Sequence, residues 1–186
     1  MKAQRGFTLI ELVLFIAIMG AGVAGTLLAF DFAARGSADP VVKKQALAIA
    51  ESLLEEIQQM PFTYCDPDDP AVSTATSAAS CAIPEAIGPE AGESRYDTFK
   101  PFDNVNDYNG FNTKTDASPG IRDITNTLIP GLANYSAEVA VAGVALSGIG
   151  ANDNASDVLL ITVTVTGPAN VTVTLAGYRT RYAPTL

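Results

Sequence analysis

The amino-acid sequence predicts an α+β fold, in which a long N-terminal helix, transmembrane in its first half and amphipathic in its second, packs on a C-terminal antiparallel sheet. An uncharged apolar run at residues 12–30 predicts the first half of the helix. Apolar residues that recur every three or four positions in 40–60 predict the second half. Alternation of apolar and polar residues within 135–183 predicts the strands.

The N-terminal segment has the composition of a membrane anchor. The uncharged run at 12–30 is about long enough to cross a bilayer as a helix. Lys2 and Arg5 precede this run and Asp31 follows it, so the positive-inside rule predicts a cytoplasmic N-terminus and an exported C-terminal domain. A cleavable secretory signal is the alternative, but residues 31–35 offer no convincing small-x-small cleavage site.

Glu11 places one carboxylate at the edge of this apolar helix. A charge in hydrocarbon costs a few kcal/mol, and an ionisable residue there is a functional candidate by default. The alternative interpretation is that the side chain only extends to the lipid headgroups. The residues around Glu11 favour a functional role.

Residues 5–12 read Arg-Gly-Phe-Thr-Leu-Ile-Glu-Leu, which resembles the prepilin leader and processing site of type IV pilins and type II secretion pseudopilins. The resemblance implies a pilin-like fold and cleavage after Gly6 by a membrane-embedded prepilin peptidase, which also methylates the amino group of Phe7. It further implies that Glu11 neutralises the N-terminal amine of a neighbouring subunit during assembly. Such a pair offsets part of the desolvation that either charge suffers alone.

This interpretation divides the chain into a cleaved leader (1–6), a transmembrane assembly helix (7–35) and an extracytoplasmic globular domain (36–186). The globular domain is expected to contain a helix over 40–60, a disulfide loop over 62–134 and an antiparallel sheet over 135–183.

The amphipathic helix is predicted to start anew after an interruption at residues 36–40. Asp39 is a good N-cap, Pro40 suits the first helical position, and Pro61 ends the helix. The predicted apolar face consists of Leu47, Ala50, Leu54 and Ile57, flanked by Ala46, Ile49 and Leu53. The predicted polar face carries Lys43, Lys44, Glu51, Glu55, Glu56 and Gln58.

At least three strands are expected to cover the apolar face. Residues 135–142 and 159–166 alternate in polarity, and the second run places Leu159, Ile161, Val163 and Val165 on one face. A turn at 167–170 and a further alternating run from Val171 to about Tyr182 predict an antiparallel hairpin over 159–182.

The segment 62–134 is poor in periodicity and contains both cysteines, Cys65 and Cys81. A structureless stretch of this length is unusual, so short elements are expected within it. An isolated cysteine pair downstream of an exporting membrane segment predicts a disulfide, worth on the order of 3 kcal/mol for such a loop. Free thiols are expected only if the domain is cytosolic.

Two oxygen-rich clusters, at 65–70 and 103–110, hold the hard ligands that calcium takes. The weak calcium candidates are Asp103, Asp107 and Asn109. Their spacing is not that of an EF-hand, and aspartates and asparagines beside proline and glycine are ordinary turn formers, which is the favoured interpretation. We therefore expect no cofactor, with calcium as the alternative.

The charge and composition disfavour several classes of function. Lys and Arg number 11 against 20 Asp and Glu, and an acidic domain repels the phosphate backbone, so no nucleic-acid partner is expected. The chain has no histidine, which removes the commonest general base and metal ligand. No motif arranges serine, lysine or carboxylates for catalysis, and we expect no enzymatic role.

A second resemblance concerns the kind of pilin. The runs at 37–40, 45–57, 65–68 and 102–108 look like those of a minor pilin of the mannose-sensitive haemagglutinin (MSHA) type pilus. This implies a low-abundance subunit that initiates, caps or supports the filament and so supports adhesion. Its partners would be prepilin peptidase, other pilins through the N-terminal helix, and the inner-membrane assembly machinery. It would first reside in the inner membrane with a periplasmic C-terminal domain, and then in the surface pilus.

Two alternatives remain open at this point. A minor pseudopilin of a type II secretion system shares the leader and anchor completely. A calcium- or ligand-binding tip adhesin is the alternative of another class.

Overall fold

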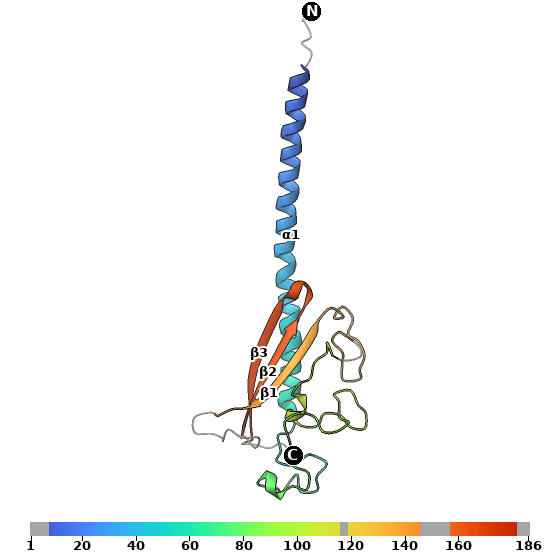
Figure 1. Ribbon diagram of the computed structural model, residues 1–186, viewed down its shortest axis with the longest axis vertical. Coiled ribbons are helices and arrows are strands. Elements are labelled where there is room, and N and C mark those ends of the chain that lie inside the picture. Colours follow the sequence, from blue (N-terminus) through green and yellow to red (C-terminus); the bar gives the residue numbers. More distant parts are fainter. Residues whose placement is uncertain (1–7, 116–118, 146–156, 182–186) are drawn as a thin grey trace, which may run out of the picture. The chain divides into compact units, whose positions relative to one another are not determined.

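The computed structural model describes residues 8–115, 119–145 and 157–181, and for 33–39 it describes the backbone only. In chain order the elements are α1 (Leu9–Gln59), the 3₁₀ turns η1 (Ala78–Ser80) and η2 (Val105–Tyr108), strands β1 (Ser136–Gly143) and β2 (Val158–Thr166), the 3₁₀ turn η3 (Pro168–Asn170) and strand β3 (Thr172–Thr180) (Figure 1). The predicted α+β class is confirmed, and a long apolar helix followed by a three-stranded antiparallel sheet fits a pilin-like layout. The chain forms two compact units that divide between Val41 and Val42.

The predicted interruption at residues 36–40 is wrong, because α1 runs through this segment with Pro40 inside the helix. Proline has a helical φ, and its missing N–H removes one backbone hydrogen bond, at a cost of about 3 kcal/mol. The helix nevertheless spans 51 residues and continues on both sides of that position. Asp39 is therefore not an N-cap. The helix does end before Pro61, since the residue ahead of a proline is disfavoured in the α conformation.

The second half of α1 buries one face, and its centre lies close to the prediction. The buried residues are Ala46, Ile49, Ala50, Leu53 and Ile57. Leu54 is half-buried, whereas Leu47 is exposed, so its place on the apolar face is corrected. Successive helical residues are about 100° apart, which puts Leu47 at the edge of a face centred on Ala46 and Ala50.

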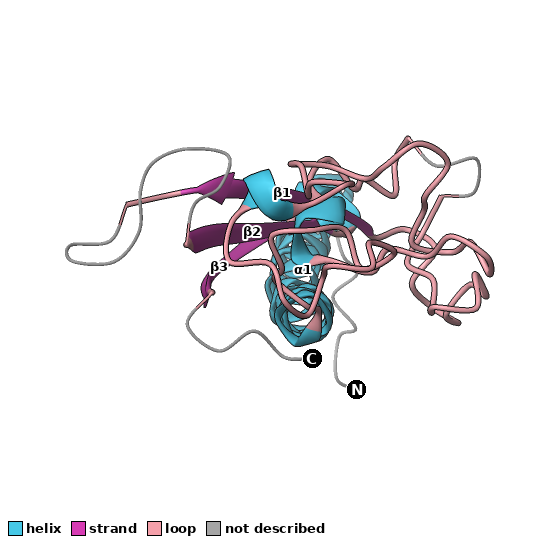
Figure 2. Ribbon diagram, turned by 90° about the horizontal axis from the view of Figure 1, so that it is seen from below, coloured by secondary structure: helices cyan, strands magenta, loops and turns pink. Residues whose placement is uncertain are grey.

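The sheet is antiparallel in the order β1-β2-β3. Its register pairs Val139 with Val163 and Val163 with Leu175. Figure 2 shows the three strands following one another across one side of α1. The predicted inward face of β2 is confirmed, because Leu159, Ile161, Val163 and Val165 are all buried.

The hairpin between β2 and β3 is confirmed, and η3 forms its turn. The N–H of Gly167 donates to the carbonyl of Val171 at 2.8 Å. Ala169 and Asn170 have φ angles of 57° and 58°, in the left-handed region that non-glycine residues visit rarely. This strand ends at Thr180, slightly short of the predicted end near Tyr182, which itself lies outside the described residues.

The hydrophobic core lies between the second half of α1 and the sheet. Helix and sheet approach closely where glycines replace larger residues. A Cβ on Gly167 would lie 2.9 Å from Val42 and 2.7 Å from the ring of Tyr135, and one on Gly177 would lie 3.2 Å from Leu54. Side chains of ordinary size at these two glycines would therefore push the hairpin away from the helix.

The disulfide predicted between Cys65 and Cys81 is present, with a Cα–Cα distance of 5.3 Å. Asp69 organises the loop that it closes, since its carboxylate accepts backbone N–H bonds from Ile83 at 2.6 Å and Ala71 at 2.7 Å. These two bonds, that from Ile83 foremost, lower the pKa of Asp69. The loop is thus ordered by a covalent bond and by a turn-forming carboxylate.

The rest of the segment 62–134 contains η2 and isolated bridges, and part of it covers the free edge of β1. Gly110 donates to the carbonyl of Val139 at 3.0 Å, and Val139 donates back to Phe111 at 2.9 Å. Thr113 donates to the carbonyl of Ala137 at 3.0 Å. This pairing satisfies backbone groups that an edge strand leaves open.

Glu56, which was predicted to lie on the polar face of the helix, connects α1 to the segment 62–134. The guanidinium of Arg95 donates to both Glu56 oxygens, at 2.7 and 2.6 Å, and the Tyr108 hydroxyl donates to one of them at 2.8 Å. The Arg95 side chain is only 8% exposed, and its guanidinium also lies over the rings of Tyr96 and Phe111. A bidentate ion pair therefore fixes the loops against the helix.

Replacement of Gly177 tests the close approach of helix and sheet. Gly177→Val should lower the free energy of unfolding by about 1–3 kcal/mol, because the added side chain meets Leu54 and displaces Gln58. The matched control is Ala176→Val, on the exposed face of the same strand. Urea unfolding of the full chain in detergent micelles compares the two, and equal stability of both variants would contradict the packing described.

Candidate functional site

The first candidate site is the N-terminal part of α1. Residues Leu9–Phe32 form an apolar stretch of 24 residues, none of it buried within the protein. At about 1.5 Å per residue this stretch is long enough to cross the hydrocarbon core of about 30 Å. It fits a single-pass membrane anchor.

Glu11 lies in the first turn of this helix. The N–H of Leu12 donates to the carbonyl of Thr8 at 3.2 Å, so the turn that carries Glu11 is already helical. A carboxylate at this end of a helix interacts favourably with the helix dipole. Gly6 and Phe7, the predicted cleavage and methylation positions, lie outside the described residues.

Comparison with known families locates a motif in the same segment. Residues 1–27 match the family model described as the prokaryotic N-terminal methylation motif. The chain carries the N-terminal motif of type IV pilins and pseudopilins. No curated protein and no solved structure matches the chain.

The motif has direct consequences for the use of this helix. It implies processing by prepilin peptidase and assembly with other pilins. Proteins with this motif act as structural subunits rather than as catalysts.

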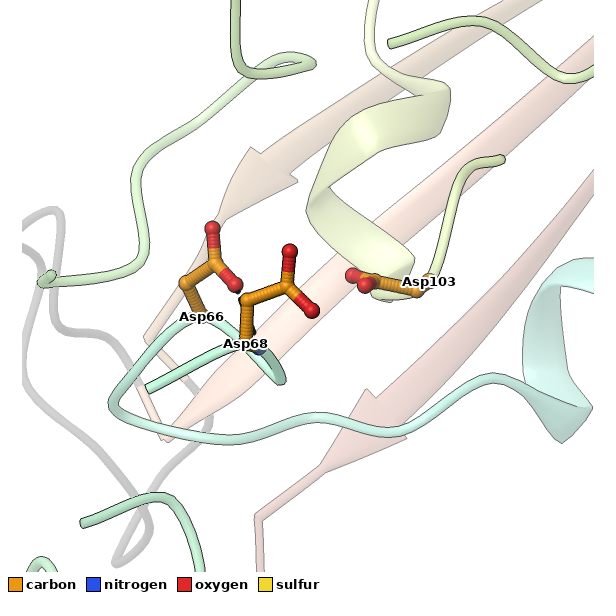
Figure 3. Close-up of side chains that lie close together, drawn as sticks. All are labelled: Asp66, Asp68 and Asp103. Carbon is orange, nitrogen blue, oxygen red and sulfur yellow. Dashed lines mark hydrogen bonds between the residues drawn. The ribbon is translucent and has the colours of Figure 1, made fainter. Parts of the chain in front are cut away.

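The second candidate site is an acidic cluster in the loops of the globular domain. Three groups of carboxylates each have their ligand oxygens within 4.8 Å of one another, and the groups are joined through Asp66 and Glu90. We call the seven residues the acidic cluster: Asp66, Asp68, Glu85, Glu90, Glu93, Asp103 and Asp107. Figure 3 shows Asp66 and Asp68 rising from one loop, with Asp103 directed toward Asp68 from a separate segment.

The three calcium candidates from the sequence have different surroundings. Asp103 and Asp107 belong to the acidic cluster. The Asn109 side chain instead accepts the backbone N–H of Val141 at 3.0 Å and helps to hold β1.

Sequence reasoning missed Glu85, Glu90 and Glu93. They lie between the two oxygen-rich runs and form no recognisable ligand pattern, since Glu85 and Glu90 each simply follow a proline. The contact that brings this segment to η2 is a hydrogen bond from the N–H of Gly88 to the carbonyl of Asn106, at 3.1 Å. Nothing in the local sequence predicts that bond.

Burial and like charges raise the pKa values in the acidic cluster. Burial is the main cause for Glu85, whose pKa rises to about 9, with the charge of Asp107 as the next cause. Burial likewise raises the pKa of Glu93 to about 7 and those of Asp103 and Asp107 to about 6. The acidic cluster is therefore destabilised whenever its carboxylates ionise without a nearby cation.

A separate open cavity of about 480 Å³ lies beside the second half of α1. Ile49 and Leu53 of the helix line it, together with Ile121 and Leu132 from the loops. The Glu56–Arg95 ion pair also borders it. This is the kind of space that a ligand-binding tip module would use.

The pKa shifts predict how stability depends on pH in a buffer with EDTA. Folded Glu85 retains a proton that the unfolded chain releases above 4.5, so the free energy of unfolding should fall as pH rises from about 5 to about 8. Urea unfolding of the full chain in micelles measures this slope.

Groups with lowered pKa values act in a different pH range. Asp69, Asp97 and Asp123 lose their stabilising contribution only as pH falls below their ordinary value of 3.8. A stability that stays constant or rises between pH 5 and 8 would show that the acidic cluster is not destabilised as described.

Proposed function

We propose that this chain is a minor pilin of the MSHA type, comparable to the MshD subunit, that joins a type IV pilus through its N-terminal helix. The observation that carries the proposal is the methylation motif over residues 1–27, continuous with an apolar helix whose first turn contains Glu11. After cleavage behind Gly6, the mature chain begins at N-methylated Phe7. Its globular domain lies in the periplasm before it enters the surface filament.

The proposed task of Glu11 follows from its position. It is the sole acidic residue in the sequence between Gly6 and Asp31, within a segment that faces lipid before assembly. An exposed carboxylate among apolar side chains gains most from an opposite charge in the same medium. In a filament that charge is the Phe7 amine of the adjoining subunit.

The MSHA assignment is supported by the runs at 37–40, 45–57, 65–68 and 102–108. These positions contribute to α1, the disulfide loop and η2. A minor pseudopilin of a type II secretion system has the same N-terminal motif and is the competing assignment. Loss of pili without loss of secreted hydrolases in a deletion strain supports the pilus, and the reverse result supports the pseudopilin.

Two substitutions of Glu11 test the assembly role. Glu11→Gln keeps size and hydrogen bonding but removes the charge, and it should abolish incorporation into sheared filaments while membrane insertion persists. Glu11→Leu should be no better, because it also leaves the amine of the neighbour unpaired. A residue that merely extended to the headgroups would make leucine neutral or favourable for the anchor.

The measurement is the partition of each variant between inner membrane and sheared filaments, with leader cleavage followed in parallel. Asp31→Asn is the matched control, since it removes a carboxylate from the other end of the span and should assemble normally. Normal incorporation of the leucine variant would contradict the assembly role of Glu11.

A further inference from the structure

The acidic cluster contains a fully buried carboxylate that is only half satisfied. One oxygen of Asp107 accepts the backbone N–H groups of Asp103 at 2.9 Å and Asn104 at 2.7 Å. Its other oxygen, Oδ1, has no hydrogen-bond partner among the described residues, and the residue is 0% exposed. A buried polar atom without a partner is costly, and its usual explanation is a bound water or ion.

The neighbours of Asp107 repeat the same pattern. Both carboxylate oxygens of Glu85 and Oε1 of Glu90 are buried and without a hydrogen-bond partner in the described part of the chain. The ligand oxygens of Glu85, Glu90 and Asp107 lie within 4.8 Å of one another. Any two of these oxygens are therefore close enough to reach a single ion at about 2.4 Å from each.

A neutral oxygen occurs on the same turn. The side-chain carbonyl of Asn106, which directly precedes Asp107, is also buried without a hydrogen-bond partner among the residues described. Amide oxygens, like carboxylates, are normal ligands of calcium. Repulsion among the carboxylates therefore does not explain the unpartnered amide oxygen of Asn106, which a water or a cation bound at η2 would satisfy.

We propose that the acidic cluster binds a calcium ion between Glu85, Glu90 and Asp107. All of these donors are oxygens, and the chain has no histidine while both cysteines form the disulfide, so the donor set suits a hard cation and not zinc. Calcium takes six to eight oxygens in flexible geometry, whereas magnesium demands a near-ideal octahedron and keeps several waters. Side chains from separate loops suit the larger, less demanding ion.

A protein cation also reaches this region. The charge of Arg181 acts on Glu85. Its guanidinium, however, lies 3.8 Å over the ring of Phe62 and 4.1 Å over that of Tyr64, and its Nε is 3.8 Å from the Asp157 carboxylate. Arg181 thus supplies positive charge near Glu85 but donates no hydrogen bond to its unpartnered oxygens.

Bound calcium would join segments that few regular elements hold together. Glu85 and Glu90 belong to the loop after the disulfide, and Asp107 belongs to η2. Through Glu90, the site adjoins Asp66 beside Cys65. The ion thus acts as a cross-link that forms where calcium is abundant, as in extracellular modules with dissociation constants of about 10⁻⁴–10⁻³ M.

The experiment uses the full chain in micelles of a non-ionic detergent, freed of divalent ions with EDTA and then titrated with calcium chloride. Calorimetry measures binding, and the urea midpoint measures the effect on stability. We expect saturable binding and a higher midpoint with calcium. Magnesium chloride at the same concentration should raise the midpoint less.

Two variants locate the ion. Glu85→Gln and Asp107→Asn should weaken calcium binding by at least about tenfold, since even the loss of a residue that supports a metal ligand costs that much. Without calcium, Glu85→Gln should be at least as stable as the parent chain, because a neutral amide of the same size replaces a buried carboxyl group that lies against two other carboxyl groups. It therefore tests the site even if Asp107→Asn fails to fold. Glu51→Gln, on the exposed face of α1, is the matched control and should bind normally.

Several results would overturn the site. These are no calcium-dependent shift in the parent chain, an equal shift in the parent chain and Glu85→Gln, or an equal effect of magnesium, which would indicate screening by any divalent ion. The inference concerns the globular domain alone and does not depend on whether the filament is a pilus or a pseudopilus.

Discussion

A single helix has to satisfy two environments, and this constraint sets the arrangement of the chain. Between Leu12 and Phe30, α1 is apolar on all sides and exposes these side chains, which suits lipid or the helices of neighbouring subunits. From Ala46 onward it is polar on one side and buries a narrow apolar face against the sheet. The second half can therefore pack in its own domain while the first remains available for assembly.

The sheet covers only one side of α1, so the loops between the helix and β1 need supports of their own. The structure provides a covalent bond between Cys65 and Cys81, a bidentate ion pair between Glu56 and Arg95, and backbone pairing along the free edge of β1. All three act on a segment with little regular structure. The acidic cluster lies where these loops meet. Ionised carboxylates alone would destabilise the packing of the loops there, and a bound cation would stabilise it.

The sequence was sufficient wherever a local pattern determined the outcome. Alternation predicted the buried side of β2, and the cysteine pair with an exporting anchor predicted the disulfide. The predicted interruption of the helix at Pro40 was wrong because an N-cap pattern reports only a local preference. A long helix can continue through a proline at the loss of one backbone hydrogen bond. Leu47 was misplaced because the buried face is narrower than the apolar repeat suggested.

Long-range partners could not be predicted. In the sequence, Glu56 looks like one more exposed acid on a polar helix face. Its partner Arg95 lies 39 residues later in the chain, so only the folded structure shows the ion pair. Glu85 and Glu90 lie in loops whose course depends on a few isolated hydrogen bonds, so no spacing rule places them beside Asp107. Acids brought together in this way have no sequence signature of the kind that an EF-hand has.

The central claim is that the chain is cleaved and assembled through its N-terminal helix, and the mass of the N-terminal peptide from sheared filaments tests it most directly. The account predicts a peptide that begins at Phe7 and carries one methyl group on its amine. Recovery of filaments whose subunits retain residues 1–6 would contradict it.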